Sequence, residues 1–234
     1  MGTVILVRHA RSTANLSGVL AGRAPGVGLD EAGVAQAEAL VARLAPVRLA
    51  AMVSSPLQRC AETVAPLAAA KGVQPSLDDR LAEVDYGLWT SQPLRTLVKE
   101  PLWKVVQLHP SAAVFPEGEG LAEVQARAVA AIREWDAKVA AEHGVDAVWL
   151  ACSHGDVIKA VLADALGMHL DSFQRILVDP CSVSVVRYTA TRPFVWRTND
   201  SGGDLTGLNP AKKRRRGRAQ PGPSDAVVGG STGT

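Results

Sequence analysis

The sequence is poor in cysteine, with three such residues among 234. Cys60, Cys152 and Cys181 are odd in number and lack the spacing of metal ligands. This pattern argues against a disulfide framework and against a cysteine-based metal site. Reduced thiols in a reducing compartment are the simplest interpretation.

Long hydrophobic runs are also missing. No apolar run approaches the roughly 20 residues that a membrane-spanning helix needs. The N-terminus lacks the basic start and the long apolar run of a signal peptide. We therefore expect no membrane partner and a cytoplasmic location.

The chain has little net charge, because 25 basic residues nearly balance 23 acidic ones. Six basic residues crowd into positions 212–218, and without them the chain has 19 basic residues and a net charge of −4. Residues 200–234 are rich in Gly, Pro, Ser, Lys and Arg without an apolar period, which predicts a disordered basic tail. No aromatic residues interleave with these charges, so nucleic acid is not an expected partner.

The remaining sequence favours one α/β domain over residues 1–199. A chain of 234 residues with 47% hydrophobic and 21% charged residues suffices for a single core. Residues 3–7 are largely apolar and mostly β-branched, as in a strand buried on both faces of a parallel sheet. Similar strands are predicted at residues 50–53 and 147–151, and further strands near the sheet edge at residues 183–188 and 194–196.

Helical patterns alternate with these strands. Asp30 is expected to cap a helix, and residues 121–139 trace one face of a long helix. Residues 12–29 have no periodicity and predict a loop. Residues 88–120, with scattered prolines and aromatics, predict a helical insertion that covers a pocket like a lid, although its aromatics fit a satellite core equally well.

Each of the first three strands leads into a basic or titratable residue. Arg8 and His9 follow the first strand, Arg59 lies in the helix after the second, and His154 follows the third. The carboxyl ends of parallel strands meet at one sheet edge, where ligands bind. Arginine suits phosphate or carboxylate, and histidine can serve as nucleophile or proton carrier.

Two helix starts are expected at these junctions. Ser55 and Gln58 flank Pro56 in the pattern of an N-cap followed by a first-turn proline. Ser153 and Asp156 have the spacing of a capping box. The start of each helix would also attract an anion.

Four segments resemble the motifs of the histidine phosphatase superfamily, also called phosphoglycerate mutase-like, and occur in the order of that family. They are residues 8–15, 54–63, 83–89 and 153–158. The first is similar to the usual Arg-His-Gly-Glu-Thr-x-x-Asn signature. The resemblance implies a three-layer α/β/α sandwich with a mostly parallel central sheet.

The resemblance also implies chemical roles. His9 would attack phosphorus and become phosphohistidine. Arg8, Arg59 and His154 would hold the non-bridging oxygens, over which charge spreads during phosphoryl transfer. Glu83 would protonate the leaving oxygen and later take a proton from water.

Further expectations concern phosphate positioning and specificity. Ser12 and Asn15 are expected to position the phosphate. No metal or other cofactor is implied, since cationic side chains do the work of a metal. Arg11 stands where the family commonly has Glu, which suggests the hypothesis that the substrate carries a second anionic group.

The leading hypothesis is a phosphomonoesterase acting on a small-molecule phosphate ester. The alternative is a phosphomutase of the phosphoglycerate mutase type, which returns the phosphate to another hydroxyl of the substrate. From a different class, a non-catalytic phospho-ligand or nucleic-acid binding protein would use the basic tail, but the presence of both His9 and Glu83 argues against it. The substrate and the oligomeric state stay open, with a homodimer as one alternative.

Overall fold

The central element of the structure is a mixed β-sheet. The computed structural model describes residues 1–203, and within them six strands form one sheet in the order β3-β2-β4-β1-β5-β6. β1 to β4 are parallel, whereas β5 is antiparallel to both of its neighbours, β1 and β6. The strands are β1 (Thr3–Arg8), β2 (Ala51–Ser54), β3 (Ser76–Leu77), β4 (Val148–Ser153), β5 (Val183–Arg187) and β6 (Phe194–Asp200).

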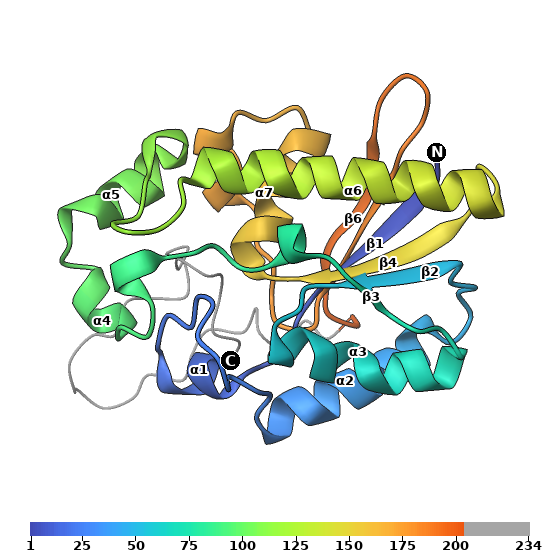
Figure 1. Ribbon diagram of the computed structural model, residues 1–234, viewed down its shortest axis with the longest axis horizontal. Coiled ribbons are helices and arrows are strands. Elements are labelled where there is room, and N and C mark those ends of the chain that lie inside the picture. The colour runs from blue at the N-terminus through green and yellow to red at the C-terminus, as the bar shows by residue number, and fades with distance from the viewer. Residues whose placement is uncertain (204–234) are drawn as a thin grey trace.

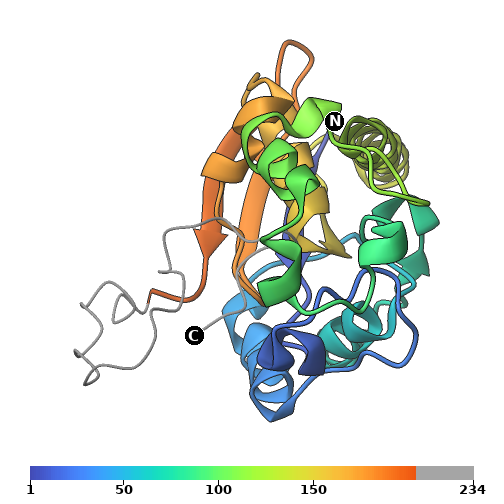
Figure 2. The same ribbon diagram turned by 90° about the vertical axis from the view of Figure 1, so that its left-hand side faces the viewer.

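Helices cover both faces of this sheet. α6 (Leu121–His143) and α7 (Gly155–Ala165) lie on one face, and α2 (Glu31–Leu44) and α3 (Gln58–Lys71) lie on the other (Figure 1). The turned view in Figure 2 also places the sheet between these two helical layers. The structure therefore confirms the predicted three-layer α/β/α sandwich with its mostly parallel sheet.

The first strand shows why the sheet needs cover on both sides. Val4 and Leu6 pack into the core beneath α6 and α7, whereas Ile5 and Val7 pack with α2 and α3. Successive side chains of a strand point to opposite faces, so an unbroken apolar run has to be buried twice. β1 thereby holds its C-terminal end, and the residues that follow it, in a fixed position between two cores.

The predicted start of α3 is wrong. The helix begins at Gln58 with Leu57 at the N-cap position, so Ser55 does not cap it. The Ser55 hydroxyl instead lies 2.8 Å from His154 Nε2 and accepts a hydrogen bond from the Leu57 N–H at 3.3 Å. Arg59 still lies in the first turn of α3, as expected.

The capping box predicted for α7 is also wrong. His154 occupies the N-cap position without a side-chain capping bond. The Ser153 hydroxyl donates to the Leu81 carbonyl at 2.7 Å, and the Asp156 carboxylate accepts from the Tyr86 hydroxyl at 2.8 Å. Tertiary partners thus replace the local pairing that the spacing indicated.

The segment predicted as a loop, residues 12–29, contains the short helix α1 (Thr13–Ser17). Ser12 caps this helix through a hydrogen bond from the Asn15 N–H to its Oγ at 3.3 Å, and the Ser12 N–H donates to Asn15 Oδ1 at 3.0 Å. Five helical residues are too few to show a 3.6-residue period. The cap at Asp30 is confirmed, since Oδ1 accepts from the Gly33 N–H at 2.8 Å.

The region from residue 88 to 120 is helical with loops, as predicted. It contains α4 (Leu94–Leu97) and α5 (Pro101–Leu108), which lie together at one end of the molecule in Figure 1. Short 3-10 turns occur at Gly87–Trp89 and Pro110–Ala112, and two further ones lie at Asp79–Leu81 and Leu170–Arg175.

The aromatic residues of this region pack against one another. The Phe115 ring lies edge-on to Tyr86, with 4.9 Å between centroids, and Trp103 stacks on Trp89 at 6.3 Å. Trp89, Tyr86 and Phe115 are buried in the core that also contains α6. These side chains therefore stabilise the fold, and a lid function of the region stays a prediction.

The last described strand, β6, forms one edge of the sheet, where the sequence placed it. It ends at Asp200, so the first residue of the predicted disordered tail, residues 200–234, belongs to this strand. The part of that tail from residue 204 onward lies outside the described residues. Within residues 1–203, no helix combines the length and the hydrophobicity that crossing a membrane requires.

Candidate active site

The ends of three neighbouring strands bring distant segments together. In the parallel register, Arg8 at the end of β1 lies opposite Ser153 at the end of β4, and Ser54 at the end of β2 lies opposite Cys152. The residues that follow these strands therefore emerge at the same edge of the sheet. His9 and His154, the next residues after β1 and β4, have ring centroids 5.2 Å apart.

The environment of His9 makes one ring nitrogen available. Its Nδ1 lies 2.7 Å from the Ala10 carbonyl, which can only accept, so we infer that Nδ1 carries the hydrogen and Nε2 the lone pair. Burial, reinforced by the positive charges of Arg59 and Arg8, lowers the pKa of His9 well below its usual value. His9 is thus held as a neutral imidazole whose Nε2 keeps its lone pair.

The backbone beside His9 is held by Thr63, one turn after Arg59 in α3. The Ala10 N–H donates to Thr63 Oγ1 at 2.9 Å, and this hydroxyl donates to the Arg59 carbonyl at 2.6 Å. The His9 N–H also donates to the Ser153 carbonyl at 2.9 Å. These bonds fix β1, α3 and β4 relative to one another at the site.

Arg59 is buried and directed toward His154. Its Nη2 donates to the Gly22 carbonyl at 2.8 Å and to His154 Nδ1 at 3.1 Å. The Arg59 Nε has no hydrogen-bond partner among the described residues, although it is buried. A buried arginine donor without a protein partner is suited to an anionic ligand.

Both ring nitrogens of His154 are engaged by protein groups. Because arginine only donates, Nδ1 accepts from Arg59, and Nε2 therefore carries the hydrogen that faces Ser55 Oγ at 2.8 Å. Burial is the main cause that lowers the pKa of His154 well below its usual value, with Arg59 and His9 adding to it. A direct bond from His154 to phosphate would therefore replace one of these two contacts.

Arg8 supplies a second buried guanidinium. Its Nη1 donates to the Val178 carbonyl at 2.7 Å. Burial lowers its pKa from the usual value, while the negative charges of Glu83, Asp156 and Asp179 act in the opposite direction. The cation is therefore retained in the interior because carboxylates surround it.

Glu83 is a buried carboxyl within electrostatic reach of both arginines. Its Oε1 accepts from the Val84 N–H at 3.0 Å. Burial and, second, the charge of Asp156 raise the pKa of Glu83 to about 7, and Arg59 and Arg8 oppose that rise. Near neutral pH the group can therefore either donate or accept a proton.

The two predicted phosphate-positioning residues pair with each other. The Ser12 hydroxyl donates to Asn15 Oδ1 at 2.8 Å, in addition to capping α1. Arg11 turns toward Asp30, with Nε 2.7 Å from Oδ2, and its N–H donates to Gln36 Oε1 at 2.9 Å. Asp30 compensates the positive charge of Arg11, so this contact gives no support to the hypothesis that the substrate carries a second anionic group.

The structure also reveals contributors that the sequence reasoning did not identify. Thr63, Gly22 and Ser55 each bond to a predicted site residue or to its neighbour. Thr63 had a signal, since it closes the second of the four motifs at four residues after Arg59. The carbonyl of Gly22 had none, because any residue type offers the same backbone group.

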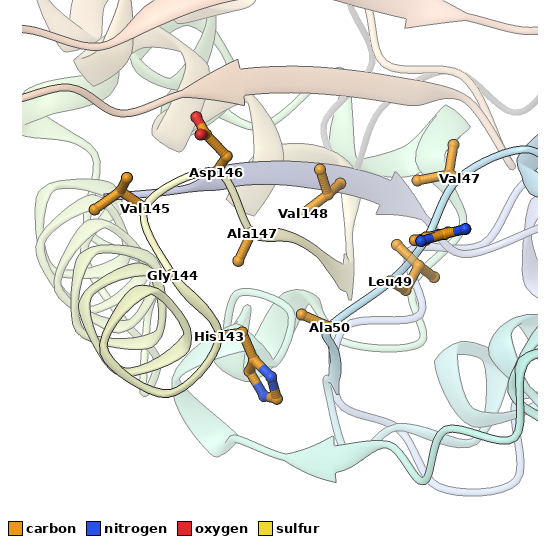
Figure 3. Close-up of a pocket in the computed structure, with 10 residues that line it drawn as sticks. Val47, Leu49, Ala50, His143, Gly144, Val145, Asp146, Ala147 and Val148 are labelled. Carbon is orange, nitrogen blue, oxygen red and sulfur yellow. The ribbon is translucent and has the colours of Figure 1, made fainter.

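A separate hollow lies at the opposite edge of the sheet (Figure 3). It has a volume of about 650 Å³ and is lined by residues 47–50 and 143–148, at the amino ends of β2 and β4. In the close-up, the side chains of His143 and Asp146 point away from each other. None of the predicted site residues lines this hollow. The candidate site is therefore the group of side chains that converge at the C-terminal ends of the parallel strands.

Within residues 1–203, no group of three or more His, Cys, Asp or Glu side chains is arranged to hold a metal ion. Arg8 and Arg59 supply buried positive charge at the site. Together with a neutral imidazole and a carboxyl of raised pKa, they can receive a phosphoryl group and move a proton.

Named proteins similar in sequence include phosphatases and mutases. Phosphoserine phosphatase 1 of Hydrogenobacter thermophilus is 30% identical over 202 residues, which cover 85% of this chain and 92% of that protein. The probable phosphoglycerate mutase GpmB of Yersinia pestis is 29% identical over 187 residues, which cover 79% and 84%.

Solved structures share the fold. YhfR of Bacillus stearothermophilus has a TM-score of 0.77 at 24% identity, covering 86% of this chain and 98% of that one. A mycobacterial glucosyl-3-phosphoglycerate phosphatase, solved with VO3, has a TM-score of 0.76 at 21% identity, covering 85% and 98%. The family model described as histidine phosphatase superfamily (branch 1) matches residues 4–201, and the chain belongs to this superfamily.

Proposed function

We propose that the protein is a phosphomonoesterase that hydrolyses a small phosphorylated metabolite through a phosphohistidine at His9. The observation that carries this proposal is the neutral His9 imidazole, with Nδ1 bonded at 2.7 Å to a carbonyl, beside the buried cations Arg8 and Arg59. Phosphoryl transfer needs an in-line nucleophile and fixed positive charge around the non-bridging oxygens.

In the first step, the lone pair of His9 Nε2 forms a bond to phosphorus while the bond from phosphorus to the leaving oxygen breaks. The electron pair of that bond stays on the leaving oxygen, and Glu83 supplies the proton that turns it into a hydroxyl. A pKa of about 7 leaves much of Glu83 protonated for this purpose near neutral pH. Arg8, Arg59 and His154 are the proposed holders of the non-bridging oxygens.

In the second step, a water molecule attacks phosphorus and the bond to Nε2 breaks. Glu83, now ionised, takes the proton of the water, so inorganic phosphate leaves and both His9 and Glu83 return to their starting forms. We further propose that Ser12 and Asn15 position the phosphate through the backbone that they shape at the start of α1.

The alternative is a phosphomutase, which passes the phosphoryl group from His9 to another hydroxyl of the substrate. The similarity to a probable phosphoglycerate mutase supports this alternative. The segment Glu-Val-Asp-Tyr at residues 83–86 is closer to the phosphatase branch, and the relative of 30% identity is named a phosphoserine phosphatase. A non-catalytic binding protein is disfavoured, because phosphate binding alone needs no carboxyl with a raised pKa.

Release of inorganic phosphate from a panel of phosphorylated metabolites tests the proposal. We expect the wild type to release phosphate, and to carry a radiolabelled phosphoryl group when its reaction with phosphate-labelled substrate is quenched. We expect neither result for a His9→Ala variant. Interconversion of phosphoglycerates in a primed assay, without net phosphate release, would support the mutase instead. Normal phosphate release by His9→Ala would refute the role of His9.

The proposed location is the cytoplasm, because Cys60, Cys152 and Cys181 are all free and buried, as expected of thiols in a reducing compartment. The proposed homodimer has one supporting feature, since β6 is an edge strand that exposes Phe194 and Trp196. Fractionation of cells and light scattering of the purified protein test these two proposals.

A further inference from the structure

Arg127, in the second turn of α6, anchors the backbone of the segment that contains Glu83. One nitrogen, Nη1, donates to the carbonyls of Arg80 at 2.6 Å and Ala82 at 2.8 Å. The other, Nη2, donates to the Glu83 carbonyl at 3.2 Å. A single guanidinium therefore fixes the backbone up to the carbonyl of Glu83.

Glu119 anchors the backbone on the other side of Glu83. Its Oε2 accepts from the Asp85 N–H at 2.9 Å, and its own N–H donates to the Asp85 carbonyl at 2.9 Å. The same carboxylate holds Arg127 by two bonds, Nε to Oε1 at 2.9 Å and Nη2 to Oε2 at 3.0 Å. This bidentate ion pair fixes direction as well as distance.

Arg23 links the anchored segment to the phosphate end of the site. Its Nε donates to the Glu83 carbonyl at 2.8 Å and its Nη2 to Glu119 Oε2 at 2.8 Å. The preceding residue, Gly22, accepts from Arg59 Nη2 at 2.8 Å. A continuous set of contacts thus joins Arg59, a proposed phosphate holder, to the backbone of Glu83.

Regular structure does not provide this support. Residues 83–86 belong to neither helix nor strand, so no ladder of backbone hydrogen bonds sets their position. The turn at residues 116–118 packs so closely on this segment that a Cβ on Gly118 would collide with the Asp85 carbonyl. The position of the acid therefore depends on the packing of this turn and on the side chains that bond to the residues beside Glu83.

We propose that the ion pair of Glu119 and Arg127 is a positioning device for the general acid Glu83, with Arg23 as its link to the phosphate-binding end. The inference rests on the proposed function, and neither member of the pair has to touch substrate. A carboxyl displaced by about 1 Å donates its proton poorly, whereas the attack by His9 is unaffected. Loss of the ion pair should therefore lower kcat/KM for esters whose leaving oxygen needs a proton.

The test compares an alkyl phosphate with para-nitrophenyl phosphate. The ratio kcat/KM covers binding and transfer to His9 but not the later hydrolysis, so it isolates the first step. Alkoxide needs a proton to leave and para-nitrophenolate does not. For Arg127→Gln we expect kcat/KM to fall about 100-fold with the alkyl ester and less than about 5-fold with the aryl ester, within the range for general acid catalysis.

For Arg23→Gln we also expect kcat/KM to fall more with the alkyl ester than with the aryl ester, but by a smaller factor. This variant removes one bond to the Glu83 carbonyl and leaves α6 intact. Arg133→Gln is the matched control on the exposed face of α6. Among the ion pairs of the described residues, Arg133 pairs only with Asp164, at 2.8 Å. It should leave both values of kcat/KM within about 2-fold, as surface pairs contribute little.

Equal losses with both esters in Arg127→Gln and Arg23→Gln would overturn the positioning role, because a general loss of folded protein lowers both values alike. The His9→Ala variant separates this failure from that of the proposed function. If His9→Ala is inactive with both esters while those losses are equal, only the positioning role fails. If His9→Ala hydrolyses both esters normally, the proposed function fails.

Discussion

The Tyr86 hydroxyl donates a hydrogen bond to Asp156 Oδ2 at 2.8 Å, and so joins the segment of Glu83 to the first turn of α7. On the other side of the same carboxylate, Lys159 Nζ lies 3.3 Å from Oδ1. Burial, followed by the charges of Asp156 and Glu83, raises the pKa of Tyr86 well above its usual value, so it keeps its proton. Within this buried group, the charge of Asp156 also raises the pKa of Glu83.

The first prediction concerns the pH dependence of kcat/KM with an alkyl phosphate. Glu83 donates a proton only in its neutral form, and its pKa of about 7 means that this form is lost as the pH rises through 7. His9 has to be neutral, and its pKa lies well below 6.5, so activity should persist on the acid side. We expect a fall of kcat/KM centred near pH 7 on the alkaline side. A profile that is flat up to pH 9 would contradict the role of Glu83.

The second prediction is that Asp156→Asn moves this alkaline fall to lower pH. Asp156 is the negative charge that raises the pKa of Glu83, while Arg8 and Arg59 lower it. Without the carboxylate, burial still raises the pKa of Glu83 but one of its two causes is lost, while both arginines keep lowering it. We therefore expect a downward shift of about 1 pH unit, typical of one nearby charge. Asp164→Asn, also in α7, is the control and should leave the midpoint unchanged. An unmoved midpoint in Asp156→Asn would show that burial alone sets the pKa.

The third prediction concerns stability. Lys159 and Asp156 form an ion pair in which both side chains are almost fully buried. Replacing one member of such a pair leaves a charge in the interior without that compensation, so Lys159→Met should lower the free energy of unfolding by about 3–5 kcal/mol. The double variant Lys159→Met/Asp156→Asn should recover part of the loss. Urea denaturation measures both, and an unchanged midpoint for Lys159→Met would refute the assignment.

Apolar patterning predicted most of the sheet. β1 and β4 were found because they are buried on both faces and so contain unbroken apolar runs. β3 was missed because two residues, Ser76 and Leu77, carry no pattern. The short helix α1 was missed for the same reason.

Serine residues, and charged residues at polar positions of a helix, were harder to interpret from the sequence. Ser55 and Ser153 have the local spacing of helix caps, but their partners are His154 and the Leu81 carbonyl, distant in the chain. Arg127 occupies a polar position in an amphipathic helix and resembles a solvated charge. Only the fold shows that its guanidinium faces three carbonyls, because their convergence depends on tertiary packing.

The last prediction concerns Arg11 and substrate charge. Its guanidinium pairs with Asp30, whose other oxygen caps α2, so Arg11 is committed to the start of that helix. We expect Arg11→Gln to leave the ratio of kcat/KM for phosphate esters with and without a second anionic group within about 2-fold, and to cost at most about 1 kcal/mol of stability, as for a partly exposed ion pair. Paired phosphate-release assays on esters that differ by one carboxylate measure the ratio. A fall of tenfold for the carboxylated ester alone would show that Arg11 leaves Asp30 to bind substrate, because an arginine that remains paired cannot distinguish the two esters.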